Sequence, residues 1–140
     1  MNQSLIFIPV LAHMLLVFTL FIKLGIAKSA AVKLGEVNRK DAALNSKAWP
    51  DSVVKISNNI GNQFETPVLF YVLAIIFFLT NTLNSAVLVL MCFYTATRYL
   101  HSYFHITTNF VPNRFKAFLA GVLILLGLTV WQLVLLINSI

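Results

Sequence analysis

Residues 65–98 read ETPVLFYVLAIIFFLTNTLNSAVLVLMCFYTATR, and only the two end residues of this stretch are charged. The polar cluster at 81–84 interrupts the apolar run near its middle, which predicts two antiparallel helices joined by a short turn. Glu65 lies 16 residues before this cluster, and Arg98 lies 14 residues after it. At about 1.5 Å of rise per residue, both side chains fall roughly 21–24 Å from the turn. We therefore expect the Glu65 carboxylate and the Arg98 guanidinium to pair at a similar depth in a membrane, where an isolated charge is costly.

The composition identifies an integral membrane protein. Of the 140 residues, 59% are hydrophobic and 10% are charged, whereas soluble domains carry about 25% charged residues. We expect one membrane domain over residues 1–140 and no separate soluble domain. The single cysteine, Cys92, excludes an internal disulfide framework and a metal site built from several cysteines.

Four apolar stretches predict four membrane-spanning helices, because a helix needs about 20 predominantly apolar residues to cross the hydrocarbon core. The expected helices cover approximately residues 5–27, 52–80, 83–107 and 114–138. We expect consecutive helices to run antiparallel, in an up-down order. The expected fold is therefore all-α, a four-helix transmembrane bundle.

The basic residues predict the orientation. All ten Lys and Arg residues lie within 23–55 or 98–116, around the first and third loops. Basic loops stay on the cytoplasmic side, so we expect both termini and the 81–84 turn on the non-cytoplasmic side. The excess positive charge then lies at the membrane surface and not on a soluble module, which argues against nucleic acid as a partner.

Polar side chains recur with helical spacing toward the cytoplasmic ends of the last three helices. They are Asn58, Asn62 and Glu65 on the second helix, Arg98, His101 and His105 on the third, and Arg114 at the start of the fourth. Spacings of three, four and seven place such residues on one helix face. The free N–H groups in the first turn of the fourth helix suit an anion. Together these groups fit a peptide-like ligand that carries both amino and carboxylate groups.

Several features have plainer interpretations. A Glu65–Arg98 pair can fix helix register without contacting a ligand. His101 and His105 could offer two metal ligands, but we favour polar packing or ligand contact and expect no metal. We expect His13 to be an interhelical hydrogen-bond partner and not part of a proton path. Gly121 fits close helix packing.

Two segments resemble a known family. Residues 62–67 (NQFETP) resemble the Asn-x-x-Glu-x-x-Pro signature of the MAPEG family, the membrane-associated proteins in eicosanoid and glutathione metabolism, with the proline one residue early. Residues 98–103 (RYLHSY) resemble that family's Arg-Tyr-x-x-x-Tyr segment. The pattern that continues from there to Arg114 is similar to the bacterial branch of the family.

The resemblance implies a homotrimer in a bacterial inner membrane that binds glutathione between neighbouring subunits as a cosubstrate. It assigns Asn62 and Glu65 to holding the tripeptide, and Arg98, Tyr99 and Tyr103 to lining the site. It makes Arg114 the catalytic residue that stabilises the thiolate. From the polar spacing we add Asn58, His101 and His105 as binding residues.

The expected activity is a glutathione-dependent transferase or peroxidase that acts on lipophilic electrophiles. The alternative is a non-catalytic membrane protein that binds a lipid or a membrane partner. In that case the polar side chains serve assembly alone.

Overall fold

The structure is a computed structural model that describes residues 1–139, and within that range it contains helices and no strand. This confirms the all-α class. The helices are η1 (Gln3–Ile6), α1 (Phe7–Lys33), α2 (Arg39–Leu44), η2 (Ser46–Ala48), α3 (Asp51–Gln63), α4 (Thr66–Leu79), α5 (Ser85–Ile106) and α6 (Val111–Ile137).

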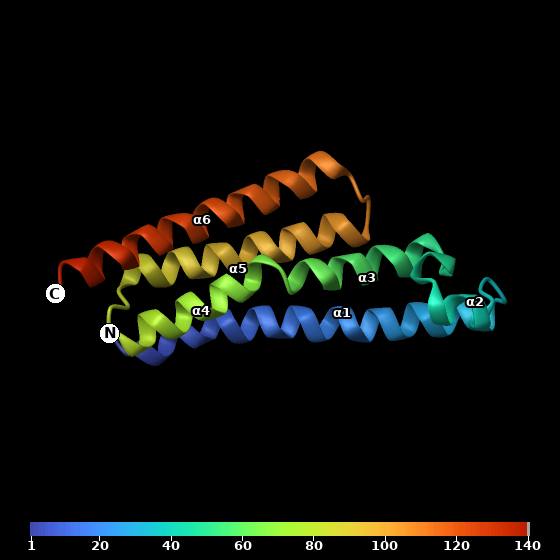
Figure 1. Cartoon of the computed structure of the whole chain (residues 1–140), viewed down its shortest axis with the longest axis horizontal. Helices are drawn as coiled ribbons and strands as arrows, with labels where there is room; N and C mark the ends of the chain where they lie inside the picture. The colour runs from blue at the N-terminus through green and yellow to red at the C-terminus, as the bar shows by residue number, and fades with distance from the viewer. Residues whose placement is uncertain (140) are drawn as a thin grey trace.

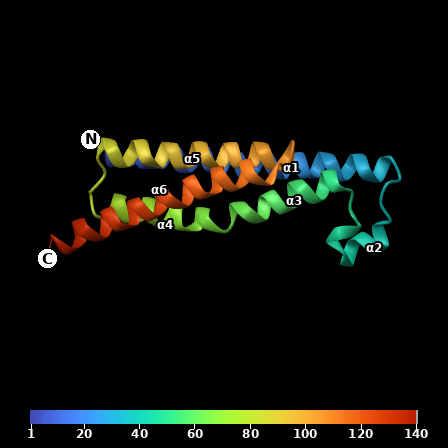
Figure 2. The ribbon, with the colours of Figure 1, turned by 90° about the horizontal axis from the view of Figure 1, so that it is seen from above.

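The long helices run roughly along one common direction (Figures 1 and 2), with α3 and α4 following one another as two segments of one rod. Both termini lie at one end of the molecule, and α2 lies at the other end. Three helical stretches within residues 1–139 are long and apolar enough to cross a membrane, namely Gln3–Lys33, Asp51–Leu79 and Val111–Ile137. The chain is therefore a membrane protein by both composition and structure.

The helix expected over 52–80 is interrupted between α3 and α4, at Phe64 and Glu65. Pro67 explains the interruption, because proline has no N–H to donate to the carbonyl four residues earlier and its ring collides with that carbonyl. The carbonyl in question belongs to Gln63, the last residue of α3. The break turns Glu65 out of the helical register that the sequence alone suggests.

The first helix is longer than expected and continues to Lys33. Gly35 terminates it with φ +69°, a left-handed conformation that glycine adopts without strain. The amides of Gly35 and Glu36 donate to the carbonyls of Val32 and Ala31 at 3.1 and 3.0 Å, which is the Schellman arrangement. α1 therefore projects several residues beyond its apolar part.

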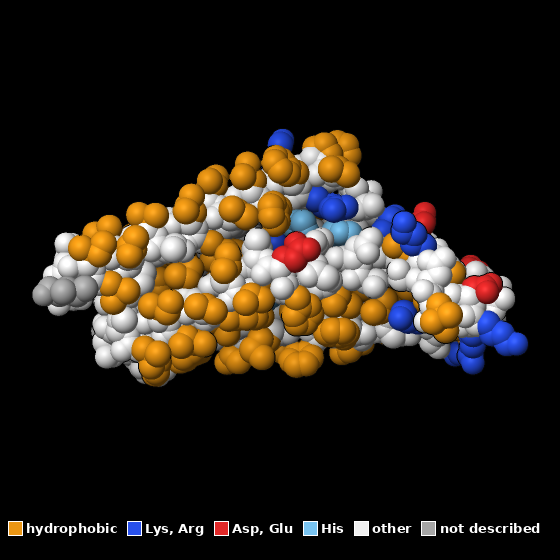
Figure 3. Space-filling view, in the orientation of Figure 1, with side chains coloured by type: hydrophobic (Ala, Val, Ile, Leu, Met, Phe, Trp, Pro, Cys, Tyr) orange, Lys and Arg blue, Asp and Glu red, His pale blue; other side chains and the backbone are white. Residues whose placement is uncertain are grey.

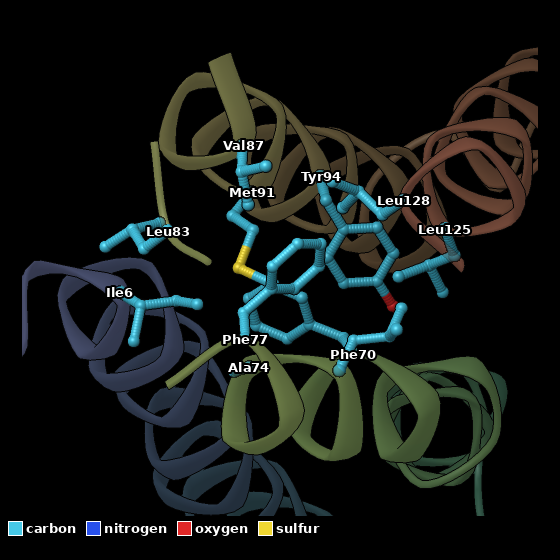
Figure 4. Packing of buried hydrophobic residues seen from close by; sticks show 11 residues of the cluster. Ile6, Phe70, Ala74, Phe77, Leu83, Val87, Met91, Tyr94, Leu125 and Leu128 are labelled. Atoms are coloured by element: carbon cyan, nitrogen blue, oxygen red, sulfur yellow. The ribbon is translucent and has the colours of Figure 1, made fainter. Parts of the chain in front are cut away.

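The hydrophobic core lies in the half of the molecule that carries the termini. It combines η1, α4, α5 and α6, and Figure 4 shows its side chains converging from these elements. Phe70 and Tyr94 are fully buried, with ring centroids 4.6 Å apart. α5 and α6 approach closely at Gly121, where an added Cβ would lie 2.9 Å from Thr97 Oγ1. The absence of a side chain at Gly121 thus sets the separation of these two helices.

A polar clasp, made of Gln3, Thr80, Thr82 and Gln132, closes this end of the bundle. Gln132 Nε2 donates to Thr80 Oγ1 at 3.0 Å, and Thr82 Oγ1 donates to Gln132 Oε1 at 2.9 Å. Gln3 Oε1 accepts from the Leu83 amide at 3.0 Å. The clasp ties the α4–α5 turn to η1 and to α6.

Candidate functional site

A polar pocket of about 560 Å³ lies beside the α3–α4 break. Its walls come from α3, the C-terminal part of α5 and the start of α6. The lining residues are Asp51, Val54, Lys55, Ser57, Asn58, Gly61, Asn62, Glu65, His105, Asn109 and Arg114. In Figure 3 an acidic side chain lies at mid-length on the visible face, with His, Lys and Arg side chains beside it and a largely hydrophobic surface toward the termini.

A second pocket of about 250 Å³ shares Asn62, Glu65 and Arg114 with the polar pocket. It also contains His101, and its remaining wall is apolar: Val111, Phe115 and Phe118. The Glu65 carboxylate, the Asn62 amide and the Arg114 guanidinium thus lie between the polar pocket and the partly apolar pocket.

Arg114 is held in place by the loop before α6. Its Nη1 donates to Asn109 Oδ1. Asn109 has φ +51°, a left-handed conformation that asparagine tolerates better than most residues. The Asn109 amide donates to the Phe104 carbonyl at 2.8 Å. The last turn of α5 therefore positions the Arg114 guanidinium through one asparagine.

The two histidines of α5 are buried and keep one nitrogen each without a partner in residues 1–139. His101 Nδ1 donates to the Arg114 carbonyl at 3.1 Å, which leaves Nε2 unpaired. His105 Nδ1 is also buried and unpaired, and the two rings lie 5.8 Å apart. Because a buried polar atom without a partner is costly, these nitrogens are candidates for ligand contact.

Arg98 does not pair with Glu65. Its guanidinium is 1% exposed and donates through Nη2 to the Asn62 carbonyl at 2.9 Å, and through Nε and Nη2 to Gln63 Oε1 at 3.3 and 3.2 Å. Arg98 therefore supplies the donor that the α3–α4 break removes from the end of α3. Its place is within the bundle, and it is absent from the lining of both pockets among the residues described.

Gln63 is the centre of a buried hydrogen-bond network. Its Nε2 donates to Asn59 Oδ1 at 2.9 Å and to Ser102 Oγ at 3.1 Å. Its Oε1 lies 3.1 Å from His13 Nε2. Because Arg98 can only donate, Gln63 Oε1 is an acceptor, so His13 Nε2 carries the proton. His13 Nδ1 then accepts from the Tyr71 hydroxyl at 2.6 Å, and His13 is an interhelical partner, as expected.

Tyr99 and Tyr103 lie on a different face of α5. Tyr99 donates to the Ala12 carbonyl at 2.8 Å, so it packs beside α1. Tyr103 is 59% exposed. Within residues 1–139, the lining of the two pockets includes neither tyrosine. The structure thus brings together Asn58, Asn62, Glu65, His101, His105 and Arg114 from the expected set and places Arg98, Tyr99 and Tyr103 elsewhere.

The sequence interpretation left out Lys55, Asn109, Asn59 and Gln63 as site residues. Lys55 lies three residues before Asn58 and lines the polar pocket with it, so its helical spacing could have identified it. Asn59 and Gln63 are four residues apart, as are Asn58 and Asn62. The packing of α5 shows which pair is buried, because Asn59 and Gln63 bond to Ser102 of α5, whereas Asn58 and Asn62 line the polar pocket. In the described part of the chain, no three His, Cys, Asp or Glu side chains come together as metal ligands.

Comparison with models of known protein families gives one match. The family model described as MAPEG family matches residues 6–134, which is nearly the whole chain. Comparison with curated proteins and with solved structures gave no match. The chain belongs to the MAPEG family.

Proposed function

We propose that this protein is a glutathione-dependent transferase or peroxidase that acts on lipophilic electrophiles. The observation that carries the proposal is the position of Arg114, which lines both the polar pocket and the partly apolar one. A thiolate held at Arg114 would meet water-soluble peptide groups on one side and a lipid-derived compound on the other.

The polar pocket supplies complementary groups for the tripeptide. The Glu65 carboxylate suits its amino group, and the Lys55 ammonium suits a carboxylate. The Asn58 and Asn62 amides suit its peptide groups. The volume of about 560 Å³ lies within the range of roughly 300–1,000 Å³ typical of small-molecule sites.

Arg114 would favour the thiolate over the thiol. A free cysteine thiol has a pKa of about 8.5 and is mostly protonated at neutral pH, and a nearby cation lowers that value. In the transferase reaction, the thiolate sulfur forms a bond to the electrophilic carbon, and the leaving group departs with the displaced electron pair. In the peroxidase reaction, two thiols are oxidised to a disulfide while a lipid hydroperoxide is reduced to an alcohol and water.

The proposal includes the membrane arrangement. α5 has 22 residues, a length of about 33 Å, which matches the hydrocarbon core of about 30 Å. With α5 there would be four spans, with the basic α2 end cytoplasmic and both termini outside. In a homotrimer, the exposed Tyr103 of one copy is available to the site of another.

Isothermal titration of glutathione into the purified protein tests this function. We expect binding in the micromolar to millimolar range, weakened at least tenfold in Glu65→Gln. Lys116→Gln is the matched control, because Lys116 is exposed two residues beyond Arg114 and lies outside the lining of both pockets as described. Absence of heat in the unmodified protein would contradict the proposal.

A second candidate function rests on a separate observation. An apolar groove of about 470 Å³ lies between α1 and α4, lined by residues that include Phe18, Phe21, Phe64 and Tyr71. This groove fits a lipid acyl chain and favours a non-catalytic lipid-binding protein. A Phe18→Trp variant that also carries Trp49→Phe and Trp131→Phe, whose fluorescence responds to brominated lipid in a protein that does not bind glutathione, would support this function.

A further inference from the structure

The loop between α1 and α3 forms a basic pocket of about 440 Å³ at the end of the molecule opposite the termini. Three cations line it, Lys28 and Lys33 from α1 and Arg39 from α2. Ser29, Val32, Ala42, Ala43 and Trp49 complete its lining. The loop also contains Glu36 and Asp41, but both lie outside the lining residues. The pocket is therefore strongly attractive to an anion.

The Lys28 ammonium lies over the face of Trp49, another lining residue of the pocket. Its Nζ lies 4.9 Å from the centroid of the indole ring, a distance at which a cation is attracted to the aromatic face. Both side chains are half-buried. This contact fixes one charge of the pocket, whereas a freely rotating surface lysine would have no fixed position.

Lys28 lies close to the depth of the lipid headgroups. Residues 5–22, in η1 and α1, lack Asp, Glu, Lys and Arg, and Lys28 follows Ile22 by six residues, or about 9 Å. The headgroup layer extends roughly 5–8 Å beyond the hydrocarbon on each side, and tryptophan favours this interface. Lys28 therefore lies near the outer edge of the headgroup layer, and Lys33, five residues later on α1, lies about 7.5 Å farther out.

A second pocket of about 320 Å³ shares Lys28, Ala42, Ala43 and Trp49 with the basic pocket and continues along Leu44, Ser46, Val53, Val54 and Ser57. Leu44 is 97% exposed, whereas Val53 is fully buried. A free phosphate ion gains nothing from the Trp49 ring or from Leu44, whereas the glycerol of a lipid can contact them.

We propose that Lys28, Lys33, Arg39 and Trp49 form a binding site for the phosphate of an anionic phospholipid. The lysines and the arginine hold the phosphate through charge-assisted hydrogen bonds. The basic pocket shares no lining residue with the pocket at Glu65, and the proposal does not rest on the proposed activity.

Two triple variants with the same change in net charge test the site. The first combines Lys28→Gln, Lys33→Gln and Arg39→Gln. The second combines Lys23→Gln, Lys40→Gln and Lys47→Gln, which lie outside the basic pocket. Circular dichroism establishes that both variants keep their helix content. Native mass spectrometry then measures how much phosphatidylglycerol and phosphatidylcholine each full-length protein retains.

We expect the unmodified protein to retain phosphatidylglycerol in preference to phosphatidylcholine. The three cations replaced in the first triple variant converge on one phosphate through charge-assisted hydrogen bonds, whereas those replaced in the second act only through diffuse surface charge. The first triple variant should therefore bind phosphatidylglycerol at least about tenfold more weakly than the second. Equal losses in both variants would overturn the proposal, because the binding would then reflect diffuse surface charge.

A second measurement separates the lipid from a soluble anion. In a Trp131→Phe protein, Trp49 is the remaining tryptophan, and its emission should shift to shorter wavelength on vesicles that contain phosphatidylglycerol. Inorganic phosphate in millimolar excess should leave this shift unchanged. Displacement by phosphate, or an equal shift on pure phosphatidylcholine vesicles, would overturn the assignment to an anionic lipid.

Discussion

Arg98 on α5 and Gln63 at the end of α3 are joined by two hydrogen bonds that converge on one oxygen, Gln63 Oε1. Both side chains are 1% exposed. A buried guanidinium usually has a carboxylate partner, but here its acceptors are a neutral amide and a backbone carbonyl. This contact joins two helices at the level of the candidate site and is expected to determine how far the pocket holds its shape.

Replacing Arg98 by Met should destabilise the protein by about 2–3 kcal/mol, because hydrogen bonds that involve a charged group contribute about 1.5–3 kcal/mol and the Asn62 carbonyl loses its partner. The measurement is unfolding in detergent, followed by circular dichroism. Lys116→Met is the exposed control. The double variant with Gln63→Leu should lose less than the sum of the single losses, and strict additivity would show that the two residues act independently.

Replacing Pro67 by Ala should weaken glutathione binding if the helix break presents Glu65 to the pocket. Alanine restores the N–H that proline lacks and favours one continuous helix through Glu65. We expect a loss of about tenfold in affinity together with slower amide exchange at residues 64–68. Pro112→Ala is the control, because proline in the first turn of α6 costs no helical hydrogen bond. Unchanged exchange and affinity would show that Pro67 does not maintain the break.

Gly121→Ala should destabilise the contact between α5 and α6. The new Cβ would lie 2.9 Å from Thr97 Oγ1, and Thr97 cannot rotate freely because its hydroxyl donates to the Tyr94 carbonyl at 2.6 Å. Overpacking of this kind costs about 1–3 kcal/mol. Gly127→Ala meets nothing within 4 Å and should be neutral or slightly stabilising in the same unfolding assay. Equal stability of the two variants would be the contrary result.

Arg114→Ala should abolish the thiolate form of bound glutathione while leaving part of the binding intact. The reason is that Arg114 supplies the cation nearest to the apolar wall of the smaller pocket, whereas Glu65 and the asparagines remain. Ultraviolet difference absorbance reports the thiolate, and titration calorimetry reports the binding. A thiolate signal of unchanged size in Arg114→Ala would remove this residue from its catalytic role, and Lys116→Ala should retain the full signal.

The membrane class and the all-α fold follow from the sequence, because charge and hydropathy vary along the chain in the same way as depth in a bilayer. The level of Arg98 along the bundle, beside the end of α3, also follows from the spacing. The partner of Arg98 does not follow. Glu65 and Gln63 differ by two residues, about 3 Å along a helix, and the spacing argument cannot separate them. Pro67 breaks the helix between Gln63 and Glu65. The break leaves the Asn62 carbonyl without a helical donor, and only the packing of α5 against α3 shows that Arg98 supplies that donor.

Helical spacing predicts those site residues that share one face of a single helix. Asn58, Asn62 and Glu65 share a face, and the structure places all three at the polar pocket. Asn59 and Gln63 form a second polar face on the same helix, and no rule of spacing indicates which of the two faces inward. Tyr99 and Tyr103 came from the family resemblance alone, and the single chain places them away from both pockets.

Arg98 finds its hydrogen-bond acceptors on α3, and this bears on how the helices enter the membrane during synthesis. In the proposed four-span arrangement, α5 would bring an arginine into the bilayer, which costs about 2.5–3.5 kcal/mol on the translocon scale for an isolated helix. The acceptors that offset this cost, the Asn62 carbonyl and Gln63 Oε1, belong to a segment that the ribosome completes earlier. Insertion of α5 is therefore more favourable once that segment is already in the membrane, so the order of synthesis suits the order of assembly.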